Sequence, residues 1–180
     1  MVRRLFVDLE STRDGTNLYH DFVELNAWYY ENEKLVSTYT AHYGHNQSNV
    51  YHLDINKDKA IQNTKAGHTT TDEDIETFIL WLEMVLDGSK CFFITYNCEW
   101  DYRIIKNWFK RNGISKKYFY DPCLCVMSLC ACRFDQFMSL TKCADKLGVQ
   151  VDSSKTHTAD YDNQLSIKLF GKLNTKLKLA

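Results

Sequence analysis

A short apolar run that ends in two acids, residues 5–10 with the sequence Leu-Phe-Val-Asp-Leu-Glu, constrains this chain more than any other stretch. The run favours a β-strand, and the two-residue period of a strand puts Asp8 and Glu10 on the same face. Two carboxylates that are buried together either share a proton or coordinate a cation. The alternative is an edge strand whose acids face solvent, as most charged residues do. Further oxygen ligands elsewhere in the chain would favour the metal site.

Length and charge limit the class of protein. A chain of 180 residues can form one domain over residues 1–180 and bury roughly 70% of its unfolded surface. Lysine and arginine number 22 against 23 acids, so an anionic partner must be met by a local patch. No apolar run reaches the roughly 18 residues of a membrane span, and the first residues lack the apolar core of a signal peptide. We therefore expect an intracellular, cytoplasmic protein with no membrane contact.

The seven cysteines are an odd count in a chain without an export signal, which favours reduced thiols over a disulfide framework. Cys123 with Cys125 and Cys130 with Cys132 raise the alternative of a zinc site. Paired cysteines in structural zinc sites usually have roughly two to four residues between them, and both pairs fall on one predicted helix that cannot surround the ion. We expect packed, reduced thiols.

Strand patterns dominate the first part of the chain and alternate with helical patterns in the second. Partial alternation and aromatic enrichment predict three antiparallel strands, over residues 4–10, 22–30 and 34–43. Residues 44–70 predict a surface connection with room for a short helix. Short strands are predicted at 91–96 and 118–120, and helices at 71–88, 101–112, from 121 onward, 140–147 and 158–173. This order predicts an α/β fold, a mixed five-stranded sheet with helices packed against it.

Further acids follow at the boundaries of these elements. Asp101 lies on the first turn of a helix directly after a buried strand, where open α/β sheets bind ligands. Asn97, four residues earlier, can share a face of that turn. In the last predicted helix Asp162 lies on the packed stripe, and His157 stands just before the helix. An acid on a packed face needs a partner, and its stripe offers no Lys or Arg within two turns.

These three stretches resemble the motifs of DnaQ-like 3′→5′ exonucleases of the DEDDh group, in the ribonuclease H-like superfamily. Residues 8–12 match the first motif, Asp-x-Glu-Thr/Ser-Thr. Residues 97–101 match the second, Asn-x-x-Phe-Asp, with Trp in the aromatic place, and residues 157–162 match the third, His-x-Ala-x-x-Asp. The resemblance covers essentially the whole chain. It implies a ribonuclease H-like mixed five-stranded sheet with helices on both faces, and a single exonuclease domain over residues 1–180.

The resemblance also implies an activity. The enzyme would hydrolyse phosphodiester bonds at the 3′ end of single-stranded or frayed DNA or RNA, releasing nucleoside 5′-monophosphates. Asp8, Glu10, Asp101 and Asp162 would hold two Mg²⁺ or Mn²⁺ ions, which prefer oxygen ligands. His157 would take the proton of the attacking water as general base. Proofreading and end trimming are the roles that such an activity serves.

Substrate contacts follow from the same resemblance. Leu9, Ser11 and Thr12 would face the terminal nucleotide, and Asn97 would support the second motif. Lys106 belongs to a basic cluster that could meet phosphates, or that is a solvated helix face serving solubility. The other members of that cluster are Lys110, Arg111, Lys116 and Lys117.

The chain departs from the family pattern after the first motif, where relatives usually have Gly. Here the sequence is Arg13-Asp14-Gly15, so the loop against the terminal nucleotide is expected to be reshaped, with an effect on substrate preference.

The alternative function is a non-catalytic module that holds a nucleic-acid end, or a structural subunit of a polymerase. Degenerate family members lose one of the acids or the histidine, and this chain has all five, which favours catalysis. The expected partner is nucleic acid with a free 3′ end, and a homodimer or a polymerase or processing complex is a compatible assembly. The sequence does not distinguish a DNA substrate from an RNA substrate.

Overall fold

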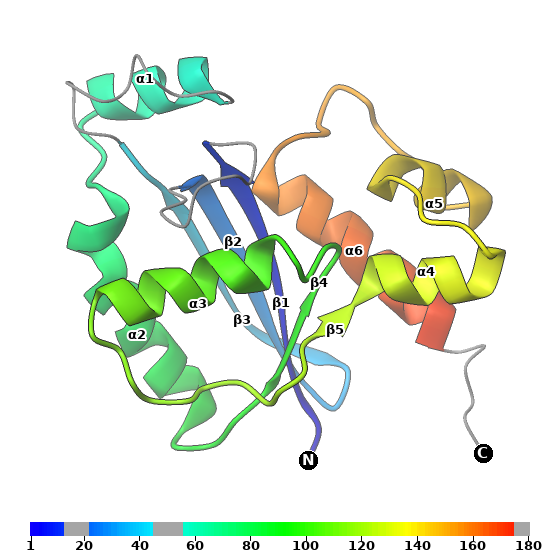
Figure 1. Cartoon of the computed structure of the whole chain (residues 1–180), viewed down its shortest axis with the longest axis horizontal. Coiled ribbons are helices and arrows are strands. Elements are labelled where there is room, and N and C mark those ends of the chain that lie inside the picture. The colour runs from blue at the N-terminus through cyan, green and yellow to red at the C-terminus, as the bar shows by residue number, and fades with distance from the viewer. Residues whose placement is uncertain (13–21, 45–55, 175–180) are drawn as a thin grey trace.

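A five-stranded mixed sheet forms the centre of the structure, a computed structural model that describes residues 1–12, 22–44 and 56–174 (Figure 1). The strand order is β3-β2-β1-β4-β5. The first three strands are antiparallel, whereas β4 runs parallel to β1 and β5 runs parallel to β4, which confirms the predicted fold class. The strands are β1 (Arg3–Ser11), β2 (Phe22–Glu31), β3 (Lys34–His42), β4 (Phe92–Thr95) and β5 (Leu124–Cys125).

Helices cover both faces of the sheet. One face carries α2 (Thr71–Leu86) and α3 (Asp101–Arg111), and the other carries α4 (Val126–Phe134), α5 (Leu140–Lys146) and α6 (Ala159–Asn174). The remaining helix, α1 (Lys57–Lys65), packs through Ala60 against Val23 of β2. Within the described ranges, no helix combines the length and the apolar character that a membrane crossing requires.

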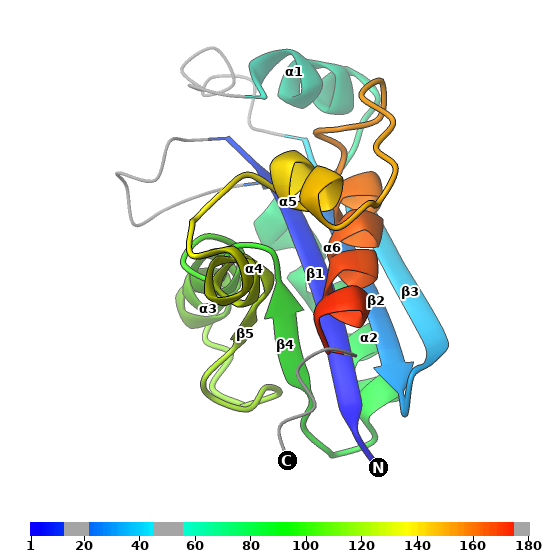
Figure 2. The same ribbon diagram turned by 90° about the vertical axis from the view of Figure 1, so that its right-hand side faces the viewer.

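The alternation of β1 decides which face receives its acids. Leu5 and Leu9 point into the core beneath α2 and α3, whereas Phe6 belongs to the core beneath α6. Figure 2 shows α6 lying along β1 and β2. Asp8 and Glu10 follow Phe6 at a period of two, so they lie on the α6 side of the sheet.

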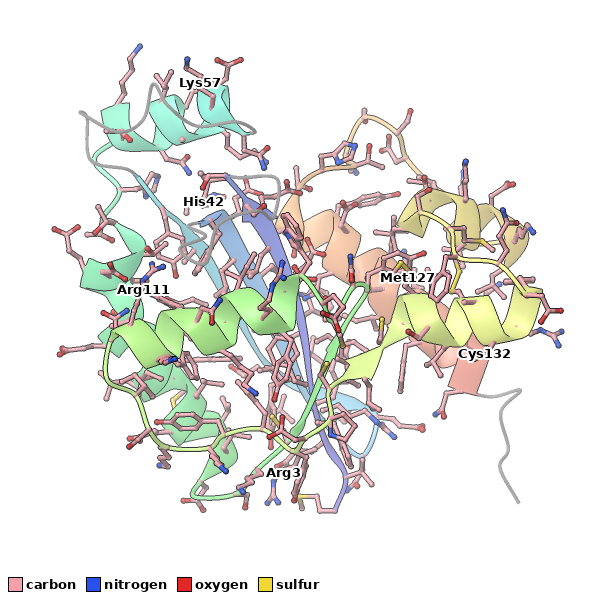
Figure 3. All side chains as sticks on the ribbon, in the orientation of Figure 1. Arg3, His42, Lys57, Arg111, Met127 and Cys132 are labelled. Atoms are coloured by element: carbon pink, nitrogen blue, oxygen red, sulfur yellow. A yellow bond between two sulfur atoms is a disulfide. The ribbon has the colours of Figure 1, made fainter. Side chains whose placement is uncertain are left out.

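Polar contacts fix α3 against α2 and thereby fix the helix that begins with Asp101. The Trp108 indole donates a hydrogen bond to the carbonyl oxygen of Thr71, at 3.1 Å. Arg111, labelled in Figure 3 at the far end of α3, forms an ion pair of 2.9 Å with Asp72. Arg111, a member of the predicted basic cluster, therefore helps to hold α3 against α2.

The segment after α3 differs from the prediction. Residues 118–120 form only a single bridge, between Phe119 and Cys91, because the chain turns away at Pro122, which lacks an N–H group for a ladder. No helix begins at residues 121–122, where the Asp121-Pro122 peptide is cis. The fifth strand is β5, and α4 begins after it at Val126.

The prediction that all cysteines are reduced is also wrong. Cys130 of α4 and Cys143 of α5 form a disulfide, with a distance of 6.6 Å between their Cα atoms. Both helices pack against α6, and this brings together two residues that lie 13 positions apart in sequence. Cys123 precedes β5 and Cys125 ends it, so the two paired motifs do not share one helix. The free cysteines of the described ranges are Cys91, Cys98, Cys123, Cys125 and Cys132.

Candidate active site

Four acids and a histidine, predicted from separate stretches of the sequence, approach one another from three elements. Asp8 and Glu10 lie on β1, Asp101 is the first residue of α3, and Asp162 lies in the first turn of α6 shortly after His157. Burial raises the pKa of Asp8 well above its ordinary value, and the charges of Asp101, Glu10 and Asp162 raise it further. We call these five residues the acidic cluster. A bound cation would relieve the mutual repulsion of the carboxylates in this cluster.

Asp101 is held in the cluster by the strand that precedes it. Its side chain is buried and accepts a hydrogen bond of 2.5 Å from the hydroxyl of Thr95, the last residue of β4. The intervening turn is closed by the N–H groups of Trp100 and Asp101, which donate to the carbonyl oxygen of Asn97 at 2.9 and 3.2 Å. Burial raises the pKa of Asp101 to about 7, although the Thr95 hydrogen bond acts in the opposite direction. The Asp101 carboxylate is therefore held in a fixed position, without enough positive charge nearby to offset its burial.

Glu10, His157 and Asp162 form the tightest part of the cluster. One possible ligand atom from each of the three lies within 4.8 Å of the others. Asp162 Oδ2 accepts a hydrogen bond from the His157 backbone N–H at 3.2 Å, whereas Asp162 Oδ1 is buried without a hydrogen-bond partner in the described ranges. Burial raises the pKa of Glu10 and of Asp162 above ordinary carboxyl values. An orphaned carboxylate oxygen beside two other donors fits a divalent cation.

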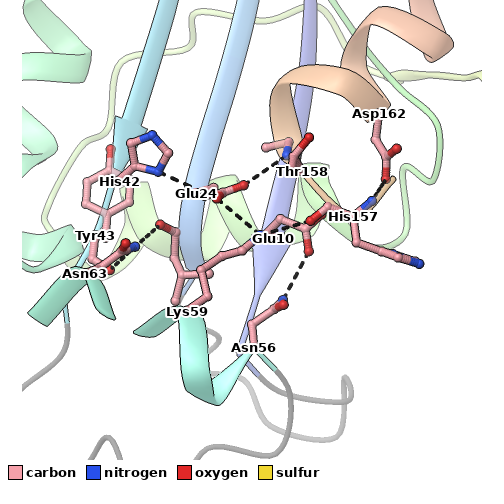
Figure 4. Close-up of polar contacts among 12 residues, drawn as sticks. Glu10, Glu24, His42, Tyr43, Asn56, Lys59, Asn63, His157, Thr158 and Asp162 are labelled. Carbon is pink, nitrogen blue, oxygen red and sulfur yellow. Dashed lines mark hydrogen bonds and ion pairs between the residues drawn. The ribbon is translucent and has the colours of Figure 1, made fainter. Parts of the chain in front are cut away.

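His157 is held by its backbone and exposes its side chain. Its φ of 65° lies in the left-handed region, which His enters more readily than most residues. The Lys59 ammonium donates a hydrogen bond to the His157 carbonyl oxygen at 2.9 Å (Figure 4). The imidazole is therefore free to meet solvent or substrate at the edge of the cluster, while its backbone is tied to α1 and α6.

Two charged residues that the sequence analysis missed, Glu24 and Lys59, border the cluster (Figure 4). Glu24 lies opposite Glu10 in the antiparallel register and accepts a hydrogen bond from the Ala159 N–H, at the start of α6, at 3.1 Å. Lys59 forms an ion pair of 3.2 Å with Glu24. The pairing of the first two predicted strands is the signal that could have placed Glu24 opposite Glu10. Lys59 comes from a stretch without a clear hydrophobic period, so the sequence offered no signal for its position.

The predicted nucleotide-facing residues lie at the end of β1. Leu9, Ser11 and Thr12 are all buried. The Ser11 hydroxyl accepts a hydrogen bond of 3.2 Å from the Trp100 indole, and its carbonyl oxygen accepts one of 2.7 Å from the Asn56 amide. These contacts join the first motif to the second and to the segment before α1.

Two other predicted features do not belong to this arrangement. Lys106 is exposed, with its Nζ 3.9 Å from Asp121 Oδ1 and 5.2 Å from the centre of the Tyr102 ring. It lines a pocket to which the acidic cluster contributes no residue. The loop at residues 13–15, predicted to be reshaped, lies outside the described residues.

Comparison with known proteins gives a clear result for structure and none for sequence. No family model matches the chain, and no curated protein matches it. The fold is nevertheless shared with solved exonucleases, among them members of the DEDDh family of 3′-exonucleases.

Three solved structures illustrate the likeness. The nuclease domain of 3′hExo, a DEDDh family member bound to rAMP, matches with a TM-score of 0.66 at 15% identity, over 99% of this chain and 94% of that one. Cell-death related nuclease 4 matches with a TM-score of 0.68 at 17% identity, over 98% of this chain and 64% of that one. Exonuclease X in complex with 5′ overhanging duplex DNA matches with a TM-score of 0.59 at 15% identity, over 100% and 95% of the two chains. The fold of this chain is therefore that of the DEDDh-family 3′-exonucleases.

Proposed function

We propose that this protein is a metal-dependent 3′→5′ exonuclease of the DEDDh type, formed by one domain over residues 1–180. It hydrolyses phosphodiester bonds at the 3′ end of single-stranded or frayed nucleic acid and releases nucleoside 5′-monophosphates. The observation that carries the proposal is the approach of Asp8, Glu10, Asp101, His157 and Asp162 from three elements on a fold shared with such exonucleases.

The residues of the acidic cluster suit divalent cations. Asp8, Glu10, Asp101 and Asp162 offer only oxygen donors, which favours Mg²⁺ or Mn²⁺ over softer metals. Burial and mutual repulsion keep these carboxyl groups from ionising freely, and Asp162 has an oxygen with no other partner among the described residues. Two bound cations would supply activation of a water molecule and neutralisation of the charge on the leaving 3′-oxygen.

Side chains and backbone groups of the protein then have distinct roles. His157 accepts the proton of the attacking water through its exposed imidazole, the side chain that most often serves as general base. The backbone N–H of His157 holds Asp162, and Lys59 holds the His157 carbonyl oxygen. These contacts keep the base beside the carboxylates, and the hydrogen bond from Thr95 does the same for Asp101.

The substrate is nucleic acid with a free 3′ end. Among the structures that share the fold, one is bound to rAMP, one to duplex DNA with a 5′ overhang, and one concerns recognition of the 3′ end of a histone mRNA stem-loop. The end of β1, from Leu9 to Thr12, is the segment that would lie against the terminal nucleotide, and Asn97 supports it from the second motif.

A nuclease assay tests the proposal. Purified protein is incubated with 5′-labelled single-stranded DNA and RNA in Mg²⁺, in Mn²⁺ and in EDTA, and we expect shortening from the 3′ end only with metal. His157→Ala should lower the rate by at least about a hundredfold, the contribution of a general base, while leaving binding of the labelled strand intact. His68→Ala, a change at an exposed histidine, is the matched control.

The outcomes separate the alternatives. Binding of a 3′ end without shortening in either metal would replace the enzyme by a non-catalytic end-binding module. Full turnover by the His157→Ala variant would remove His157 from the mechanism. Shortening of only one of the two strands would identify the sugar that the site accepts.

A further inference from the structure

A pocket of about 450 Å³ lies beside α3, on residues that the acidic cluster does not use. It opens between α3 and the segment 113–121, and its size is within the range of small-ligand sites. Phe109, Tyr118 and Phe119 are largely buried and form its floor, and Ile114 adds a further apolar group. The polar and charged side chains of its lining are Tyr102, Lys106, Lys110, Ser115, Lys116, Lys117 and Asp121.

Two of its four lysines are already engaged. Lys106 lies 3.9 Å from Asp121 and over the Tyr102 ring, with 5.2 Å between Nζ and the ring centre. Lys116 forms an ion pair of 3.0 Å with Glu83. These contacts hold both ammonium groups at the rim of the pocket.

The other two lysines of the pocket have ammonium groups without an ion-pair partner in the described part of the chain. Lys110 and Lys117 are exposed and form no ion pair within the part of the chain that the structure describes. Asp121 is the only acid in the lining, so the four lysines leave a clear excess of positive charge. The cationic rim above this packed apolar floor accepts the phosphates of a polynucleotide strand.

The position of the pocket relates it to the acidic cluster. Asp101 begins α3 in the cluster, and Lys110 lies nine residues further along the same helix. At 1.5 Å per residue this is about 14 Å along the helix axis. A stacked strand places one phosphate every ~3.4 Å, so about four nucleotides span that distance. An anionic strand that extends from the cluster along α3 can therefore reach the pocket.

We propose that this pocket is a second binding site for the polynucleotide strand whose 3′ end lies at the acidic cluster. It receives phosphates at Lys110 and Lys117, about four nucleotides from the reacting end. This inference rests on the proposed exonuclease function. A nucleic-acid strand is favoured over an acidic peptide because a strand whose 3′ end lies at the acidic cluster carries regularly spaced phosphates along α3 to Lys110 and Lys117.

A double charge reversal, Lys110→Glu with Lys117→Glu, tests the site. Binding of a fluorescent 20-nucleotide single strand is measured by anisotropy in EDTA at several salt concentrations, which does not require hydrolysis. Each phosphate contact to a single strand contributes about 0.7 to the salt slope, so loss of two contacts should lower the slope by about 1.4 and weaken binding about 25-fold in 0.1 M salt. The matched control is Lys142→Glu with Lys168→Glu, at exposed positions on α5 and α6.

Activity measurements then distinguish this site from the catalytic one. In Mg²⁺ the double variant should show a raised KM for the 20-nucleotide strand and unchanged kcat/KM for a dinucleotide, which is too short to reach the pocket. Lys110→Gln with Lys117→Gln should show the same pattern in weaker form.

Several results would overturn the proposal. A wild-type Kd and salt slope in the double variant would do so, as would equal loss of activity on the dinucleotide and the long strand. Competition by polyglutamate as strong as that by unlabelled oligonucleotide would point to a general anion site instead. If the wild-type protein shortens no strand at all, the proposed enzyme function fails, while the anisotropy result still decides whether the pocket binds a strand.

Discussion

Replacing Asp101 by Asn should stabilise the metal-free protein while removing the proposed hydrolytic activity. The buried Asp101 carboxyl has its pKa raised from 3.8 to about 7, chiefly by burial. An acid whose folded-state pKa is raised costs stability as the pH rises from its unfolded pKa to its folded pKa, because the unfolded chain ionises first. Between about pH 5 and pH 7 this amounts to roughly two pKa units, or about 3 kcal/mol, and the loss is complete above pH 7.

The asparagine cannot ionise, so the variant escapes that loss. It also removes a charge that opposes ionisation of Asp8, which acts in the same direction. In EDTA we therefore expect the stability of Asp101→Asn, relative to the wild type, to increase by about 3 kcal/mol between pH 5 and pH 8. Saturating Mg²⁺ at pH 8 should reverse the order, because only the wild type keeps its full set of carboxylate ligands.

Urea unfolding followed by circular dichroism at both pH values, with EDTA and with Mg²⁺, measures these differences. Asp145→Asn, at an exposed position on α5, is the matched control and should follow the wild type throughout. Parallel pH profiles for Asp101→Asn and the wild type in EDTA would refute the reasoning, since they would mean that Asp101 ionises as easily in the folded protein as in the unfolded chain.

Two further predictions follow from groups outside the cluster. Asn163 donates hydrogen bonds to the Asn26 side-chain oxygen (2.7 Å) and to the Phe6 carbonyl oxygen (3.2 Å), so Asn163→Leu should cost about 2 kcal/mol by leaving buried acceptors unpaired. An unchanged urea midpoint would contradict this. A hydrogen bond from Cys98 lowers the pKa of Cys125 to about 5, whereas burial raises that of Cys91 to about 12. Iodoacetamide at pH 7 should therefore modify Cys125 well before Cys91, as peptide mapping can show, and the opposite order would be inconsistent with these environments.

The parts of the fold that the sequence predicted are those with strong local signals. The apolar run of β1 and its two acids appear as expected, because the strand period and the burial of Phe6 leave little choice of face for Asp8 and Glu10. The helix predicted over residues 71–88 also followed from local signals, its acidic first turn and its apolar period, and it is observed as α2 over Thr71–Leu86. Elements with a clear period and clear ends could be read without tertiary information.

The parts that were missed depend on contacts between distant residues. The fifth strand has only two residues, too few for any period, and is defined by its pairing with β4. Cys130 and Cys143 are joined because two helices pack on a third, which the spacing alone does not reveal. Lys59 takes part in the site through an ion pair with Glu24, 35 positions away in the printed sequence. Such contacts are tertiary facts and leave no local pattern.

The separation along the chain between β1 and α6 has a consequence for how the protein is made. The Asn163 side chain of α6 bonds the carbonyl oxygen of Phe6, 157 positions earlier, and β1 carries the first two acids while α6 carries the last. At roughly 5–20 residues per second, a ribosome needs about 8–30 s to pass from one to the other. A growing chain lacks His157 and Asp162 until nearly the end of that time. On the proposed mechanism, a chain that stops before residue 157 lacks both the general base and one metal ligand, so the catalytic site is complete only when the start of α6 has been made.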